Sequence, residues 1–148
     1  MEVTKLLTIY RRSNNHFVKS CARKLAKYLG CVIGDGVQLG NNVQFVHNSI
    51  GTVINSGAII EDNVQIYQNV TIGRADVKST GSTSWLIKKG SILCAGAKIL
   101  CRPGQKIVIG ENSIIGANAV LLNSVPRNEV WGGYQQKRLV TLNKGENI

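Results

Sequence analysis

Residues 54–73, "INSGAIIEDNVQIYQNVTIG", repeat one pattern every six residues. Each hexad begins with isoleucine, has Gly or Asn at its fourth position, and carries a small or β-branched residue at its fifth. A period of six matches neither an amphipathic helix nor a half-buried strand. It predicts a parallel β-helix, in which short strands joined by tight corners point one bulky residue per side into a shared core. A β-sandwich has no reason to keep such a period.

The same pattern runs through most of the chain, in two blocks that begin at Ile33 and Ile87. Large apolar residues occupy the first position of every hexad, and the predicted core therefore consists of Ile33, Leu39, Phe45, Ile54, Ile60, Ile66, Ile72, Ile87, Leu93, Ile99, Ile109, Ile115 and Leu121. Gly and Asn gather at the corners, where a sharp turn requires a positive φ or a side chain that caps its own turn. The sequence thus predicts a mainly β fold.

Residues 14–29 follow a helical period. Phe17, Cys21, Leu25 and Leu29 recur every four residues, after Asn14 or Asn15 as N-cap and before Gly30 as the stop. We expect this apolar face to pack over the open end of the β-helix, because terminal coils need caps. Contact of the same basic helix with a membrane surface is the alternative. The predicted domains are a helical cap over residues 1–30, a β-helix over residues 31–138 and a tail over residues 139–148.

The net charge of +10 is unevenly distributed. Seven Lys or Arg and one acidic residue occur in residues 1–28, and again in residues 74–106. Residues 29–73 contain no Lys or Arg. This gap argues against a uniformly basic nucleic-acid-binding protein. It favours particular anionic partners, such as cofactor phosphates or an acidic membrane surface. Four cysteines without C-x-x-C spacing predict reduced thiols, and the absence of a convincing signal peptide predicts a cytoplasmic protein, with the inner face of the membrane as its alternative site.

One of the two histidines, His47, lies where the hexads are interrupted. Phe45 and Ile54 are nine residues apart instead of six. The extra residues leave slack for a local bulge, which re-aims side chains and frees backbone donors. A polar corner residue of the β-helix is the simpler interpretation of His47 from the spacing alone, although a neutral imidazole can accept a hydroxyl proton near physiological pH. His16, in or before the helix, is expected to be structural.

With the hexads and His47 in register, residues 30–138 resemble the hexapeptide-repeat acyltransferases. Within that family they are most similar to the serine acetyltransferases and their relatives in capsule and exopolysaccharide gene clusters. The motifs that carry the resemblance are "VHNSIGTVI", "AIIEDNVQIYQNVTIG", "GSILCAGAKIL" and "IGENSIIGANAVLLNSVP". It implies a left-handed β-helix, a homotrimer, acetyl-CoA in a groove between neighbouring subunits, and direct attack of an acceptor hydroxyl on the thioester with His47 as base.

The resemblance also implies where acetyl-CoA binds. Small residues of the later coils, Gly73, Ala95, Gly96 and Ala117, let a pantetheine arm approach the main chain, although tight corners explain small residues equally well. Near the C-terminus, "WGGYQQKRL" departs from the family pattern but keeps two basic residues. Lys137 and Arg138 are expected to meet the CoA phosphates, and Trp131 or Tyr134 either stacks on the adenine or simply packs.

The sequence departs from the family at the acceptor site. The acidic residues that serine acetyltransferases carry directly before the histidine and fifteen residues before it are Val46 and Val32 here, and Ser84 stands in place of a second histidine. These departures favour a hydroxyl of a sugar or surface polysaccharide as acceptor over L-serine. The remaining candidates for this site are Asn48 and Glu61 as orienters of the imidazole, and Trp85, in the loop of residues 74–86, as a platform for a sugar ring.

Several other functions remain as alternatives. Serine O-acetylation and N-acetylation of an amino sugar are the enzymatic ones, and an inactive β-helical scaffold is the one from another class. A zinc site like that of β-helical carbonic anhydrases is disfavoured because it needs three histidines, and no metal is expected. Cys94 and Cys101 are discounted as acyl-carrying nucleophiles because each occupies a hexad slot with no histidine nearby in sequence.

Overall fold

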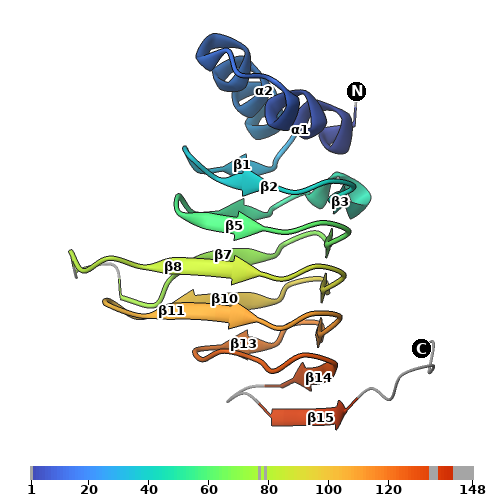
Figure 1. Ribbon diagram of the computed structural model, residues 1–148, viewed down its shortest axis with the longest axis vertical. Coiled ribbons are helices and arrows are strands. Elements are labelled where there is room, and N and C mark those ends of the chain that lie inside the picture. The colour runs from blue at the N-terminus through green and yellow to red at the C-terminus, as the bar shows by residue number, and fades with distance from the viewer. Residues whose placement is uncertain (1, 77, 79, 134–136, 142–148) are drawn as a thin grey trace.

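The chain forms a three-sided parallel β-helix with two helices over its N-terminal end (Figure 1). The computed structural model describes residues 2–76, 78, 80–133 and 137–141. Strands one coil apart pair in parallel, and β14 and β15 at the C-terminal end pair antiparallel.

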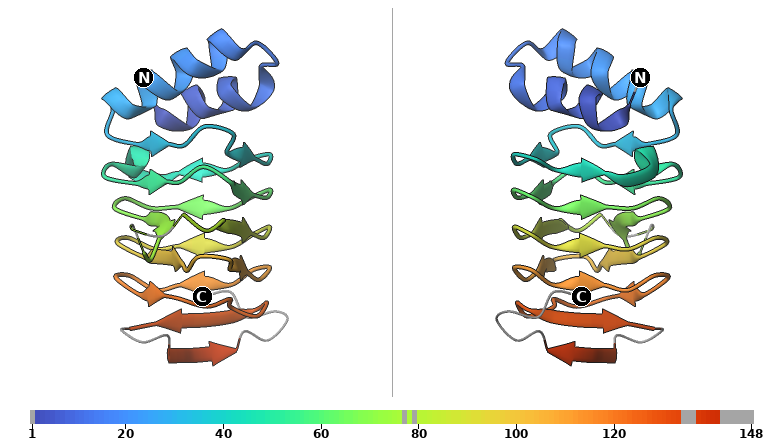
Figure 2. Two further views of the ribbon diagram at one scale, coloured as in Figure 1. Left: turned by 90° about the vertical axis from the view of Figure 1, so that its left-hand side faces the viewer. Right: turned by 90° about the vertical axis from the view of Figure 1, so that its right-hand side faces the viewer.

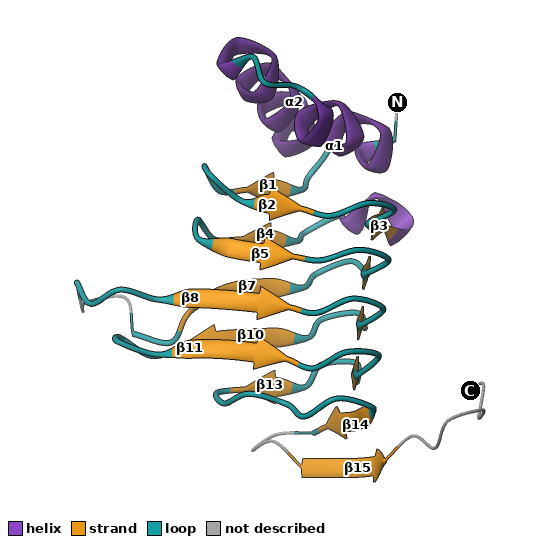
Figure 3. Cartoon of the chain, in the orientation of Figure 1, coloured by secondary structure: helices purple, strands orange, loops and turns teal. Residues whose placement is uncertain are grey.

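The strands lie in three sheets, one on each side of the prism. Sheet A consists of β1 (Val32–Ile33), β4 (Val53–Ile54), β7 (Thr71–Arg74), β10 (Lys98–Cys101) and β13 (Val120–Leu121). Sheet B consists of β2 (Gln38–Leu39), β5 (Ala58–Ile60), β8 (Ser84–Ile87) and β11 (Lys106–Ile109). Sheet C consists of β3 (Gln44–Phe45), β6 (Gln65–Ile66), β9 (Ile92–Leu93), β12 (Ile114–Ile115), β14 (Glu129–Gly132) and β15 (Lys137–Thr141). Figure 3 separates these strands from the corners between them.

The core lies inside the prism and follows the hexad pattern. Every predicted first-position residue is buried except Leu39, which is half-buried against the same cluster. Ile66 and Ile72, for example, expose none of their surface, and burial of such a side chain contributes about 1.5–3 kcal/mol. Six corner asparagines adopt positive φ between 52° and 59°, namely Asn42, Asn63, Asn69, Asn112, Asn118 and Asn128. The prediction of the core and its corners is therefore confirmed.

Two helices, not one, cover the first coil. α1 (Val3–Arg12) precedes α2 (His16–Tyr28), and Figure 2 shows α1 between α2 and the coils. Asn15 caps α2 as predicted, since its side chain accepts hydrogen bonds from the backbone N–H groups of Phe17 and Val18. Gly30 follows with a φ of 90°, which favours glycine. The sequence pattern did not indicate α1 as a separate helix.

The predicted packing face of α2, which also includes Val18 and Ala22, is only partly correct: Ala22 is buried and Leu29 packs against the core, but Phe17 and Leu25 point away from it. Ala22 and Ala26 are buried, whereas Phe17 is 75% exposed and Leu25 is 48% exposed. The buried apolar side chains of α1, among them Leu6 and Leu7, fill the space above the first coil, and small side chains on α2 let the two helices approach closely. The larger apolar residues of α2 therefore face outward. No helix in the described part of the chain is long and apolar enough to cross a membrane.

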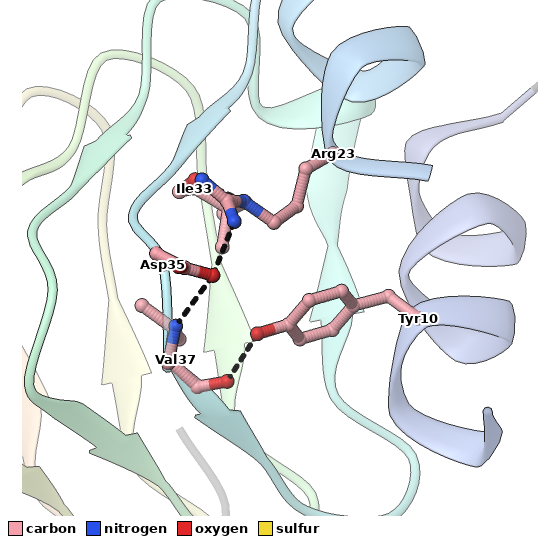
Figure 4. A network of polar contacts seen from close by, with 6 residues as sticks. Tyr10, Arg23, Ile33, Asp35 and Val37 are labelled. Carbon is pink, nitrogen blue, oxygen red and sulfur yellow. Dashed lines mark hydrogen bonds and ion pairs between the residues drawn. The ribbon is translucent and has the colours of Figure 1, made fainter. Parts of the chain in front are cut away.

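Polar contacts fasten the two helices to the first coil (Figure 4). The Tyr10 hydroxyl donates to the Val37 carbonyl at 2.8 Å, and burial raises the pKa of this phenol above its ordinary value. Arg23 donates from Nε to the Ile33 carbonyl at 3.1 Å and pairs with the Asp35 carboxylate. The helices and the β-helix consequently share one core.

Candidate active site

His47 lies on a left-handed turn between β3 and β4, in the short segment η1 (Val46–Ser49). His47 has φ 53° and ψ 36°, Asn48 has φ 57° and ψ 12°, and Ser49 has φ 44°. Consecutive non-glycine residues in this region are strained by roughly 1–3 kcal/mol each and persist only where their surroundings fix them. The interruption of the hexads thus produces a turn outside the ladder, where a bulge was expected.

The coil below fixes the C-terminal side of this turn. The Ser49 hydroxyl donates to the Ile66 carbonyl at 2.7 Å, and the Thr52 hydroxyl donates to the Tyr67 carbonyl at 3.0 Å. The Asn69 N–H donates to the Ile50 carbonyl at 2.9 Å. Side-chain hydroxyls thereby replace the ladder hydrogen bonds that the interruption removes.

The first turn of α1 fixes the turn at a residue before His47 and at the residue directly after it. The Thr4 hydroxyl oxygen accepts a hydrogen bond from the Phe45 N–H at 3.1 Å, and the Asn48 side-chain oxygen accepts one from the Val3 N–H at 3.1 Å. β3 is the edge strand of sheet C, so Phe45 needs a partner from the helices. Asn48, expected as an orienter of the imidazole, instead caps α1.

The His47 side chain is exposed, and the edge of its ring meets Tyr67, with ring centroids 6.1 Å apart and an interplanar angle of 64°. No residue in the described part of the chain forms a hydrogen bond with the imidazole. Two apolar residues that follow His47 in the sequence are exposed, Ile50 by 58% and Val53 by 42%, and the polar Gln44 before it is exposed as well. Val32, one of the departures from the family pattern, pairs with Val53 across sheet A.

Three predicted acetyl-CoA residues lie on the same edge of the prism as His47. The corners between sheet C and sheet A stack one below another, and they carry the His47 turn, Gln68 and Asn69, Ala95 and Gly96, and Ala117 and Asn118 in that order. Backbone hydrogen bonds join successive corners: the Gly96 N–H donates to the Gln68 carbonyl at 3.0 Å, and the Asn118 N–H donates to the Ala95 carbonyl at 2.9 Å. The structure therefore brings His47, Ala95, Gly96 and Ala117 together along one line.

Two of the predicted glycines are small for different reasons. Gly96 has a φ of 73°, and an added Cβ would collide with the Asn118 side chain, so its corner requires glycine. Gly73 has no such requirement: among the described residues a Cβ there would meet only Thr71 Cγ2, at an ordinary 3.4 Å. The fold therefore does not demand glycine at position 73, where the residue is buried within the subunit, and its role in binding acetyl-CoA stays a prediction.

The other predicted acceptor residues lie at other corners. Trp85 is 1% exposed and belongs to the core, so its prediction as a platform for a sugar ring is wrong. Alternation along β8 turns this side chain inward, because Ile87, two residues later, also points into the core. Ser84 is the first residue of β8, next to the corner between sheets A and B. Glu61 lies at the corner between sheets B and C, where its carboxylate accepts a hydrogen bond from the Lys89 N–H at 3.0 Å. Within one subunit neither is brought to the His47 edge.

The C-terminal candidates are only partly described. The backbones of Lys137 and Arg138 pair with Gly132 and Trp131 across β14 and β15, whereas their side chains, like all of Tyr134, lie outside the described residues. The Trp131 indole donates to Glu129 at 2.6 Å and packs partly against the core, which supports packing over adenine stacking. The CoA-phosphate role of the two basic residues stays a prediction.

The cysteines show no sign of nucleophilic activation. All four are free thiols, and burial raises the pKa of Cys94 above its ordinary value, which disfavours the thiolate. In the described part of the chain, no group of three His, Cys, Asp or Glu residues could hold a metal ion. The sequence pattern did not reveal Thr4 or Thr52, because their roles depend on contacts between segments far apart in the chain.

Comparisons with known proteins agree with this geometry. The chain is 35% identical to a serine acetyltransferase from Staphylococcus xylosus over 118 residues, which cover 80% of this chain and 52% of that protein. A serine acetyltransferase from Haemophilus influenzae is 34% identical over 112 residues, covering 76% of this chain and 39% of that protein. The chain is homologous to the serine acetyltransferases. No family model matches the sequence.

Solved serine acetyltransferases share the fold. The enzyme from Brucella abortus superposes with a TM-score of 0.76 at 26% identity, covering 95% of this chain and 57% of that chain. A serine acetyltransferase in complex with CoA gives a TM-score of 0.73 at 28% identity, covering 93% of this chain and 55% of that chain. The chain spans about half the length of these solved relatives. The predicted fold, a left-handed parallel β-helix with a helical cap, is confirmed.

Proposed function

We propose that the protein is an acetyl-CoA-dependent O-acetyltransferase in which His47 is the general base. The observation that carries the proposal is the position of this exposed imidazole, on a fixed left-handed turn at the head of the edge that carries Ala95, Gly96 and Ala117. Gly73, whose glycine the fold does not demand, adds room for a pantetheine arm. Homology to proteins named serine acetyltransferase, one of them solved with CoA, supports the same activity.

The proposed reaction needs no covalent intermediate on the protein. Neutral His47 takes the proton of the acceptor hydroxyl while its oxygen forms a bond to the thioester carbonyl carbon. The carbon–sulfur bond then breaks, and the CoA sulfur leaves with the proton that the imidazole held. Backbone N–H groups at a corner would stabilise the oxyanion between the two steps. The products are an acetyl ester and free CoA.

Two acceptors have support. The relatives' names favour L-serine over the sugar hydroxyl that the sequence predicts. The sugar or polysaccharide hydroxyl remains the second candidate because Val32, Val46 and Ser84 stand where the resemblance implies acidic residues and a histidine for serine. An acetyl-CoA assay with L-serine and with neutral sugars in parallel separates the two.

A homotrimer would complete the site. The turn with His47 lies between sheets C and A, whereas residues 75, 76, 78 and 80–83 lie between sheets A and B, on the opposite side of the prism in Figure 1. If this loop shapes the acceptor site, it must come from a neighbouring subunit. A closed ring of three prisms places the loop of each subunit beside the His47 edge of the next.

The decisive test compares His47→Asn with His16→Asn. Asparagine tolerates the left-handed conformation of position 47 but cannot act as a base, so acetyl transfer should fall by about 100-fold or more. Acetyl-CoA should still raise the melting temperature of this variant, because the corners that bind it are unchanged. His16→Asn removes the other, exposed histidine and should retain activity. Absence of both acetyl transfer and stabilisation by acetyl-CoA in the unsubstituted protein would favour a non-catalytic scaffold.

A further inference from the structure

We infer that the first turn of α1 is a positioning element for His47, with Thr4 and Asn48 as its positioning residues. The inference rests on the proposed function, because it concerns the geometry of the proposed base. It assigns to the N-terminal helix a role beyond covering the end of the β-helix.

The contacts between α1 and the turn are reciprocal. Thr4, in the first turn of α1, accepts from the Phe45 N–H, two residues before His47. Asn48, directly after His47, accepts from the Val3 N–H at the start of α1. The first N–H groups of a helix have no partner within it, and an edge strand has free N–H groups. Each element therefore satisfies a backbone donor of the other, with His47 between the two contacts.

These two bonds are the side-chain links from α1 to the residues that flank the imidazole. Of the links from the coil below, the one through Ser49 acts at the last residue of the turn and the one through Thr52 acts beyond it. The His47 imidazole forms no hydrogen bond within the described residues, and its ring meets the edge of Tyr67. The direction of the imidazole consequently depends on the backbone at positions 45–48, and α1 fixes that backbone on both sides.

Asn48 is suited to this position for two reasons. Its φ of 57° lies in the left-handed region that asparagine tolerates better than most residues. Its short side chain is also a good acceptor for helix N–H groups. Asn48→Gly would keep the backbone conformation and remove only the acceptor, so it separates the hydrogen bond from backbone strain.

Thr4→Val is the primary test, because it keeps the shape of the side chain and removes the acceptor. We expect kcat to fall by about tenfold with little change in the KM for acetyl-CoA, since one lost positioning hydrogen bond affects the reacting geometry more than cofactor binding. Thr4→Ser restores the hydroxyl and should restore most of kcat. Thr8→Val is the matched control: the Thr8 hydroxyl bonds only the Thr4 carbonyl within α1, so its loss should leave kcat unchanged.

Imidazole NMR provides a readout that does not depend on acetyl transfer. The chain has two histidines, so the His16→Asn variant assigns both signals. In Thr4→Val and Asn48→Gly, the His47 signals should shift or broaden while the His16 signals stay unchanged. If the unsubstituted protein transfers no acetyl group yet the His47 signals respond in this way, the proposed function fails and the positioning role stands.

The opposite results overturn the inference. Unchanged His47 signals together with kcat within about twofold of the unsubstituted protein would show that α1 is only a cap. A loss of kcat in Thr4→Val that follows a fall in melting temperature, and that Thr4→Ser does not reverse, would assign Thr4 to stability alone. Should Thr4→Val fail to fold, Asn48→Gly decides by the same two measurements.

Discussion

At the scale of single residues, the backbone conformation of a position determines which side chains it accepts. His47, Asn48 and Ser49 occupy left-handed geometry because hydroxyls and helix N–H groups hold them there. Gly96 is glycine because its corner requires it, whereas Gly73 lies in a regular strand that would accept a Cβ. The same residue type thus marks a structural corner in one place and a candidate cofactor contact in another.

This difference predicts opposite outcomes for two alanine substitutions. Gly73→Ala should leave the melting temperature nearly unchanged and raise the KM for acetyl-CoA by about tenfold, or 1.4 kcal/mol, because the new methyl group occupies space meant for the cofactor. Gly96→Ala should destabilise the fold by roughly 1–3 kcal/mol, because of its positive φ and the contact with Asn118. Thermal melts and steady-state kinetics measure both. An unchanged KM in Gly73→Ala would remove Gly73 from the cofactor site.

At the scale of elements, the junction between the helices and the first coil combines apolar burial with buried ionisable groups. Burial raises the pKa of Cys31 from 9.0 to about 12, and burial also raises the pKa of Tyr10, whose hydroxyl reaches the Val37 carbonyl. Both groups stay protonated in the fold at pH values where they ionise in the unfolded chain. These two groups therefore make the junction sensitive to alkali.

This sensitivity predicts a fall in stability with rising pH. The contribution of Cys31 is fully present below pH 9 and is lost as the pH rises toward 12, at a rate of at most about 1.4 kcal/mol per pH unit for one proton. Urea unfolding at a series of pH values should show a shallower decline in Cys31→Ala. Cys21→Ala, which removes a half-buried thiol in α2, is the control. Parallel declines in all three proteins would assign the alkaline effect to other groups.

At the scale of the whole molecule, each prism carries the parts of its proposed active site on opposite sides. One edge presents His47 and the small corner residues, and the corner between sheets A and B carries the loop of residues 75–83. At the N-terminal end, α2 directs Phe17, Leu25 and Tyr28 outward, with Lys24 and Lys27 also exposed. The proposed assembly and the alternative membrane contact would thus involve different faces of the molecule.

Subunit mixing tests the proposed trimer. His47→Asn and a variant with a shortened loop should each be inactive as homotrimers. After joint refolding, about a quarter of the sites should combine an intact His47 edge with an intact loop from the neighbour, and activity should return to about that fraction. Light scattering establishes the trimer independently. If mixing restores nothing although mixed trimers form, the loop does not act across the subunit boundary.

The outward face of α2 tests the membrane alternative. The unsubstituted protein should sediment with vesicles that contain phosphatidylserine, and less with pure phosphatidylcholine, because exposed apolar residues and lysines act together at an anionic surface. Joint substitution of Phe17→Ser and Tyr28→Ser should reduce this binding severalfold. Ile59→Ser, on an exposed position of sheet B, is the control. Equal sedimentation of the double variant would exclude α2 as the contact.

The sequence alone determined the β-helix, its core and the start of α2 after a capping asparagine, Asn14 or Asn15. These features depend on a period of six or on local side-chain hydrogen bonds, and both are visible within short segments. It also singled out His47, because the interruption of a regular pattern is a local signal. Only the tertiary structure decided that Phe17 faces outward, that Trp85 lies in the core, and that Thr4 and Asn48 join α1 to the His47 turn. These features depend on which segments meet in space, and residues more than forty positions apart leave no periodic trace of their contact.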